Sequence, residues 1–260
     1  MSGRPNTGSG YAAGLPRLAA EHPEGIAYAI SAVCWAALLL VPAGRAAAAF
    51  CVGDDRLAAL SFSAGAALAG FEWTPALSHW LTMVGAMMLP MAAMALRHVA
   101  FRSLPERRGR AMAGFIAGYW LVWLAVAPLY LLAGVGAHVL ANGAVLPPLA
   151  AALALAAAWQ AAPARKRALR LCHRIVPLPP SGWAADRACV AFGLEHGRAC
   201  LVSCWALMLI PVAAGHHPAL MLGVMAAGLA ERRIPRVRPE RGVLPLAAGA
   251  LLCAAAAGIT

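Results

Sequence analysis

Long apolar runs separated by short polar or glycine- and proline-rich connections organise this chain. An apolar run of about 20 residues is long enough to cross a bilayer as a helix. The pattern predicts an all-α polytopic membrane helical bundle with six or seven transmembrane helices. We expect these helices at about 26–43, 77–96, 111–133, 145–161, 190–214, 219–230 and 243–259.

Two segments do not fit this pattern as firmly. Residues 1–25 are rich in Gly, Pro and small polar side chains and are interpreted as a flexible cytoplasmic tail, leaving 26–260 as a single transmembrane helical domain. Residues 57–71 are apolar but short and dominated by small side chains. The sequence leaves open whether this segment is interfacial, re-entrant or a short span.

The overall composition supports a membrane protein. Hydrophobic residues make up 62% of the 260-residue chain and charged residues only 12%, whereas an ordinary soluble domain is about half apolar and a quarter charged. Such a chain lacks the polar side chains to cover a globular surface, which argues strongly against a soluble enzyme with one large core. Seven cysteines, set mostly in apolar runs, also argue against a disulfide framework.

The net charge of +11 comes from 21 Lys and Arg against 10 Asp and Glu. Much of it lies in three segments, 97–110, 165–174 and 232–241, which alternate with connections 134–144 and 215–218 that contain no Lys or Arg. Because short basic connections stay on the cytoplasmic side, the alternation places the N-terminus in the cytoplasm. No aromatic-interleaved basic face is present, so no nucleic-acid partner is expected.

Methionines and histidines form a stripe at helical spacing in the second apolar run. Intervals of three or four residues keep side chains on one face of a helix. The stripe consists of His79, Met83, Met87 and Met91, with Met94 and His98 continuing it and Met88 beside it. Thioethers are soft neutral ligands that suit Cu(I). Methionine is also a common packing residue, which is the competing interpretation. Pro90 should kink this helix.

The fifth run carries the more specific pattern. His196, Cys200, Cys204 and Met208 follow one another at intervals of four, so that neighbouring members share a helix face. All four are soft or borderline metal ligands, suited to Cu(I), or to zinc with a further ligand from another helix. The alternative is that the cysteines serve as small apolar packing residues.

These motifs carry a family resemblance. The segments HGRACLVSCWALM at 196–208 and AMMLPM at 86–91, supported by Trp159-Gln160, Cys172 and Glu231, resemble an uncharacterised bacterial family of predicted metal-binding integral membrane proteins. The resemblance covers about 77–233 and implies metal binding in a bacterial inner membrane. Two cysteines usual in the family are replaced here by Ser203 and Ala168, which lowers the number of thiols.

Secondary candidates lie outside the two stripes. Cys172 and His173 lie in a basic segment, 165–175, that we expect to be an amphipathic interfacial helix, and the pair could dock a soluble metal carrier. A lone Cys-His pair is a weak signal, so we favour an ordinary helix end. The expected topology places four histidines near the outer surface, where they could collect a metal ion: His79, His138, His216 and His217. A plain surface turn explains the last two nearly as well.

The chain contains no P-loop, nucleophile elbow, HExxH or Rossmann glycine motif, and we do not expect an enzyme. The leading hypothesis is a membrane transporter or membrane metallochaperone that handles a soft metal ion, copper as Cu(I) first and zinc second. The alternative is a structural or assembly subunit of a larger membrane complex, without metal, whose small-residue faces pack against partner helices.

Overall fold

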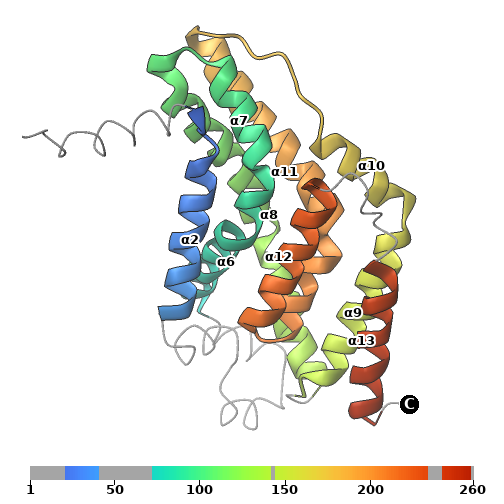
Figure 1. Cartoon of the computed structure of the whole chain (residues 1–260). Helices are drawn as coiled ribbons and strands as arrows, with labels where there is room; N and C mark the ends of the chain where they lie inside the picture. The colour runs from blue at the N-terminus through green and yellow to red at the C-terminus, as the bar shows by residue number, and fades with distance from the viewer. Residues whose placement is uncertain (1–20, 41–71, 142–143, 234–241, 259–260) are drawn as a thin grey trace, which may run out of the picture.

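The computed structural model describes residues 21–40, 72–141, 144–233 and 242–258, and over these residues the chain is helical without strands (Figure 1). The predicted all-α class is therefore confirmed. The helices are α2 (Gly25–Leu40), α6 (Trp73–Met88), the 3-10 turn η1 (Leu89–Ala92), α7 (Ala93–Arg102), the 3-10 turn η2 (Pro105–Arg107), α8 (Arg108–Leu140), α9 (Leu146–Ala161), α10 (Pro163–Cys172), α11 (Gly182–Ala213), α12 (Pro218–Arg233) and α13 (Val243–Ala256).

Each predicted apolar run coincides with a helix, and the undecided segment 57–71 lies outside the described residues. Among the described residues, three stretches are long and apolar enough to cross a membrane: Trp73–Arg102, Pro105–Ala137 and Gly182–Ala213. A fourth is reached if α9 and α10, bent by 75° at their junction, count as one span. The helices α2 and α13 are apolar but shorter.

The helices α8 and α11 form the centre of the bundle, and glycines bring their backbones into contact. A Cβ atom added at Gly193 of α11 would lie 2.2 Å from the carbonyl oxygen of Phe115. One added at Gly118 of α8 would lie 2.3 Å from the carbonyl oxygen of Val190. Only glycine fits at such a crossing, because small residues let helix backbones approach closely.

Pro90 breaks the second apolar run, as predicted, and a neighbouring helix compensates for the break. The chain passes from α6 to α7 through η1, which contains Pro90. A proline inside a helix leaves the carbonyl four residues earlier without its donor, here Ala86. The Ser31 hydroxyl of α2 donates to that carbonyl oxygen at 2.6 Å. This buried hydrogen bond explains why a serine lies on the inner face of an otherwise apolar helix.

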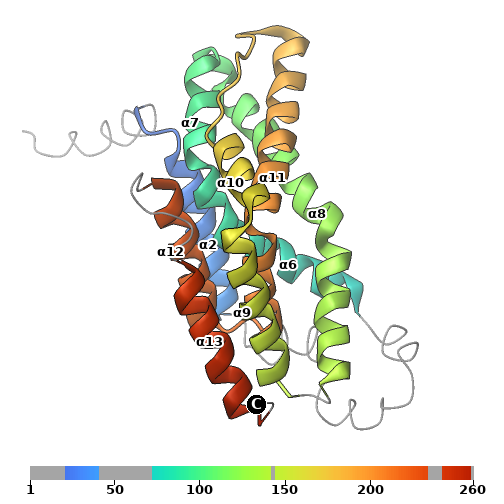
Figure 2. The same ribbon diagram turned by 90° about the vertical axis from the view of Figure 1, so that its right-hand side faces the viewer.

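The remaining helices surround the central pair (Figures 1 and 2). The last helix, α13, lies beside α9, and α2 lies beside α6. The short helix α10 packs against α11, and α12 contacts α11, α6 and η1. These contacts place the ends of α10 and α12 beside the middle of α11.

Hydrogen bonds and ion pairs join the described parts of the basic segments to other elements of the bundle. Arg107 and Arg110 form ion pairs with Asp186 at the start of α11, the second at 2.7 Å. The segment after α10 joins them, because the His98 ring is hydrogen-bonded to the Val176 carbonyl at 2.8 Å. His173 is bonded in turn to the carbonyl of Arg232 at 3.1 Å.

Candidate functional site

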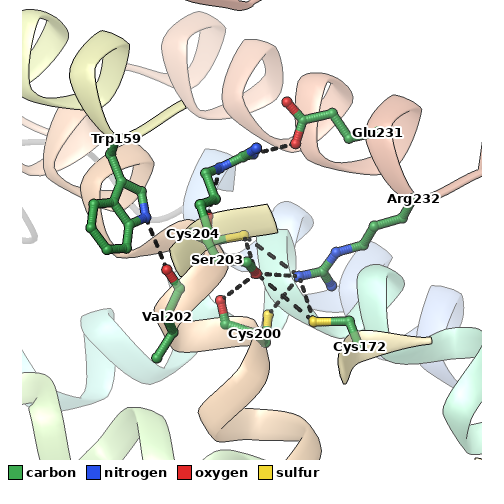
Figure 3. Close-up of polar contacts among 9 residues, drawn as sticks. Trp159, Cys172, Cys200, Val202, Ser203, Cys204, Glu231 and Arg232 are labelled. Carbon is green, nitrogen blue, oxygen red and sulfur yellow. Dashed lines mark hydrogen bonds and ion pairs between the residues drawn. The ribbon is translucent and has the colours of Figure 1, made fainter. Parts of the chain in front are cut away.

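Three cysteines gather around one arginine where α10, α11 and α12 meet (Figure 3). Nη2 of Arg232 lies 3.2 Å from Sγ of Cys200, 3.5 Å from Sγ of Cys204 and 3.7 Å from Sγ of Cys172. The Ser203 hydroxyl lies among the same atoms, 3.1 Å from Nη2. We call these five residues the thiol cluster.

Local helix geometry explains the arrangement. The interval of four residues sets Cys200 and Cys204 on one face of α11, and both are buried, at 0% and 2% exposure. Cys172 is the last residue of α10, and Arg232 is the last but one of α12. The ends of α10 and α12 therefore meet the middle of α11. Arg232 reaches the buried cysteines from the end of its helix, so its backbone stays at the edge of the apolar bundle.

Tyr119 of α8 joins the thiol cluster to the methionine stripe. Its hydroxyl lies 3.1 Å from Sγ of Cys200 and 3.1 Å from the carbonyl oxygen of Met88. Arg232 makes a parallel link, because its Nη1 donates to the Met91 carbonyl oxygen at 3.4 Å. The two predicted metal-binding faces are thus connected through α8 and α12. Both helices contact α6 and α11, and α12 also contacts η1.

A buried ion pair fixes the end of α12. Arg165 of α10 is fully buried and pairs with Glu231. Nε of Arg165 also donates to the Ser203 carbonyl at 3.0 Å. A buried guanidinium requires a partner charge and satisfied donors. The pair holds α10, α11 and α12 together next to the thiol cluster, and so it positions Arg232.

His196 lies one helical turn from Cys200 but does not join the thiol cluster. Its ring is surrounded by the aromatic rings of Phe115, Tyr119 and Phe192, at centroid distances of 5.8, 6.0 and 6.1 Å. The residue is only 4% exposed, and neither ring nitrogen has a hydrogen-bond partner. One side of the residue lines a cavity between α10 and α11.

The predicted methionines are buried in the main core. Met83, Met87, Met88 and Met208 have no exposed surface, and Met91 is 7% exposed. Met91 packs on α12, since its thioether lies against Gly228, where an added Cβ would come within 2.4 Å of it. The structure places the stripe in the bundle core beside the thiol cluster.

The secondary candidates are distributed differently. Met94 is 67% exposed, on a face away from the core. The His98 ring is occupied by its hydrogen bond to Val176 and by an edge contact with Phe192. Both lie on α7, beyond the break at η1.

Two of the histidines predicted at the outer surface meet at the other end of the bundle. The rings of His79 and His216 lie 5.0 Å apart in an edge-to-face arrangement. His216 follows Gly215 in the turn after α11, and both adopt a φ of 60°. Burial, and then the charge of His79, lower the pKa of His216 to about 3. His217 is exposed in the same turn.

Sequence reasoning missed the arginine and underrated Cys172. Arg232 was interpreted only as a topology signal, whereas its guanidinium contacts three sulfur atoms. The available signal was the Glu231-Arg232 pair at the end of an apolar run. Among the described residues, no three or more His, Cys, Asp or Glu side chains form a group that could hold a metal ion. Any ligand set here therefore combines two thiols or includes thioethers.

The geometry defines a class: an all-helical, apolar bundle whose buried thiols and thioethers suit a soft monovalent cation and lie beside one arginine. A family described as PpoB2, copper chaperone, matches residues 77–259. The chain belongs to this copper chaperone family. The match continues past residue 233, where the resemblance noted in the sequence ends, and so includes α13. No curated protein and no solved structure matches the chain.

Proposed function

We propose that the chain is a membrane protein that binds Cu(I) as cargo between Cys200 and Cys204, with Cys172 beside the same guanidinium but outside the ligand set. The observation that carries this proposal is the approach of one guanidinium nitrogen to all three sulfur atoms. Together with membership of a copper chaperone family, it supports a site for soft metal ions rather than an inert packing of cysteines. Thiolates bind Cu(I) strongly and select it over harder ions.

The charges of such a site balance. Two thiolates that bind one Cu(I) carry a net charge of −1, and the guanidinium of Arg232 carries +1 next to them. An unpaired charge in an apolar interior is costly, whereas a paired one is tolerated. Arg232 is a counter-ion here and not a ligand, because guanidinium has no lone pair to donate. Without metal, the same nitrogen stabilises the thiolates that the metal will need.

Helix lengths support a position at the inner edge of a bilayer. At about 1.5 Å per residue, the 33 residues of α8 reach about 50 Å and the 16 residues of α12 about 24 Å, against an apolar core of about 30 Å. The helix α8 is therefore longer than the apolar core, and α12, which is about 6 Å shorter than that core, ends close to the inner boundary when it starts at the outer one. Exposed leucines on α2, α8 and α13 fit a lipid-facing surface: Leu39, Leu129, Leu140, Leu251 and Leu252.

In the proposed topology the protein is a multi-pass protein of the bacterial inner membrane with a cytoplasmic N-terminus. The thiol cluster then lies near the cytoplasmic face, and the histidine pair His79–His216 lies near the outer face. Buried methionines Met83, Met87 and Met91 occupy the path between them and serve as neutral relay ligands for Cu(I). A soluble metal carrier is the cytoplasmic partner. The protein is accordingly a copper transporter or a membrane copper chaperone.

The test is a titration of the purified full chain with Cu(I) in detergent against a competing chelator. Replacing Cys200 and Cys204 by serine should weaken binding by more than the roughly 10–100-fold expected from losing an outer-shell partner. Cys253→Ser is the matched control, since this half-buried cysteine lies on α13, away from the thiol cluster.

Unchanged Cu(I) affinity in the double variant refutes the site. Tight zinc binding by the wild type with no Cu(I) binding refutes the choice of metal. Recovery of a stoichiometric membrane partner with no metal would favour the assembly-subunit hypothesis instead.

A further inference from the structure

A cavity of about 400 Å³ lies between α10 and α11, next to the thiol cluster but separate from it. Its walls are largely apolar, and include Ala168, Leu171, Phe192 and Val202. Its volume falls within the range of pockets that hold small molecules, about 300–1,000 Å³. None of the thiol-cluster residues lines it.

The lining includes one buried polar group with no partner. His196 borders the cavity, is 4% exposed and has no hydrogen-bond partner on either ring nitrogen. Buried polar groups are normally satisfied, and an orphaned one calls for an explanation such as a missing ligand. A neutral imidazole offers one lone pair, which is a good donor to Cu(I). Cys200 lies one turn further along the same helix face.

The cavity is also positively charged at its edge. Arg167, Arg174 and Arg198 line it with Glu195 as the one acidic residue, and all four are exposed. Within the described part of the chain, none of these arginines takes part in an ion pair. Guanidinium groups bind carboxylates through paired, charge-assisted hydrogen bonds. The edge is therefore suited to a small anion that carries several carboxylates.

We propose that this cavity binds a small carboxylate-bearing thiol complex of Cu(I) and is the place from which copper passes to the thiol cluster. The arginines hold the carboxylates of the carrier, and the metal faces His196. One imidazole nitrogen donates its lone pair to Cu(I) as one carrier thiolate dissociates and takes a proton from water. Copper stays Cu(I) throughout, and Cys200 then replaces the remaining carrier thiolate, which leaves as a thiol after taking the Cys200 proton.

The choice of copper in this inference rests on the proposed function. The anion site does not, because it is argued from the residues that line the cavity. A phospholipid headgroup shares the negative charge and would also reach the arginines. It would leave His196 without a ligand at the apolar end of the cavity, because an acyl chain offers no donor or acceptor. The orphaned imidazole therefore favours the thiol complex.

The probe is reduced glutathione, which carries two carboxylates and a thiol, titrated into the full chain in detergent by calorimetry. We expect binding by the wild type and a loss of about tenfold or more for Arg167→Gln combined with Arg198→Gln, since charge-assisted hydrogen bonds are lost. The matched control is Arg102→Gln, an exposed arginine at the end of α7 that does not line the cavity.

A second measurement follows copper transfer from the Cu(I)–glutathione complex. His196→Phe keeps an aromatic ring among its neighbours but removes both nitrogens. It should leave glutathione affinity within about twofold and slow the transfer by about tenfold or more. The double serine variant of Cys200 and Cys204 should still bind glutathione but retain no copper.

These arms separate the two proposals. Glutathione binding that persists while copper is not retained by the wild type would refute the thiol site and leave the cavity assignment standing. Tight Cu(I) binding with no glutathione binding, equal affinity in the arginine double variant, or binding of short-chain phosphatidylglycerol alone would each overturn the cavity proposal.

Discussion

The crossing of α8 and α11 makes Gly193 a sensitive position. In Gly193→Ala the new Cβ would lie 2.2 Å from the Phe115 carbonyl oxygen and 3.0 Å from the backbone nitrogen of Tyr119. Ordinary contact begins at 3.4 Å, so the first pair of atoms must separate by 1.2 Å. Both clashing atoms belong to the backbone, and no side-chain rotation relieves them. The two helices have to move apart.

The cost can be bounded. Overpacking a well-packed interior costs about 1–3 kcal/mol. The separation also lengthens the 3.1 Å contact between the Tyr119 hydroxyl and Sγ of Cys200, and a lost hydrogen bond adds about 1 kcal/mol. Because alanine has a higher helix propensity than glycine, the substitution also stabilises α11 by up to about 1 kcal/mol, which offsets part of this cost. We therefore expect a net destabilisation of about 1–3 kcal/mol, with weaker Cu(I) binding because Tyr119 is displaced.

The assay is unfolding of the purified chain from mixed micelles by a denaturing detergent, followed by Cu(I) titration of each folded variant. Gly136→Ala is the control, since a Cβ at this α8 position meets nothing within 4 Å. It should be neutral or slightly stabilising. If Gly193→Ala unfolds at the same detergent fraction as Gly136→Ala and binds Cu(I) equally well, the close helix contact does not hold the site as we argue.

Three further outcomes are expected. Glu231→Gln leaves the buried Arg165 guanidinium unpaired and should cost about 3–5 kcal/mol in an unfolding titration; a cost below 1 kcal/mol would contradict a desolvated pair. Arg232→Met should lower Cu(I) affinity about 10–100-fold by removing the counter-ion, and unchanged affinity would remove its assigned role. The pKa of His216 is about 3 in the folded chain and 6.5 in the absence of its surroundings, so the folded state binds this proton less tightly than the unfolded one. Stability is then fully present above about pH 6.5 and declines as the pH falls; His216→Asn should flatten that decline in unfolding midpoints measured from pH 7 to pH 5.

The sequence was a good guide wherever local periodicity determined the outcome. Apolar runs located the helices, and Pro90 located the break between α6 and α7. The interval of four correctly placed Cys200 and Cys204 on one face. Helix ends were less accurate: α11 begins at Gly182, eight residues before the apolar run at 190, because its first turns are polar and pair with Arg107.

What the sequence could not supply were contacts between helix ends that are distant along the chain. Cys172 and Arg232 are 60 residues apart and meet only because α10 and α12 both end beside the middle of α11. No periodicity links such positions. The surroundings of His196 were also unpredictable, since its ring lies among aromatic rings and at a cavity, while its role as a ligand stays a prediction. A histidine at the correct helical phase can still be separated from its neighbours by side-chain direction.

The proline break has a consequence for how the two halves of the bundle communicate. The Met88 and Met91 carbonyls lie at the 3-10 turn, and their oxygen atoms contact the same two groups, Tyr119 and Arg232, that contact the sulfur atoms. A cation that binds the sulfurs competes with those two donors for the sulfur lone pairs, so that Tyr119 and Arg232 shift and the bonding of the turn changes. By thermodynamic reciprocity, any change that straightens the turn alters the affinity at the sulfurs to the same extent. Metal occupancy of the cysteines on α11 and the bend between α6 and α7 therefore report on the same equilibrium.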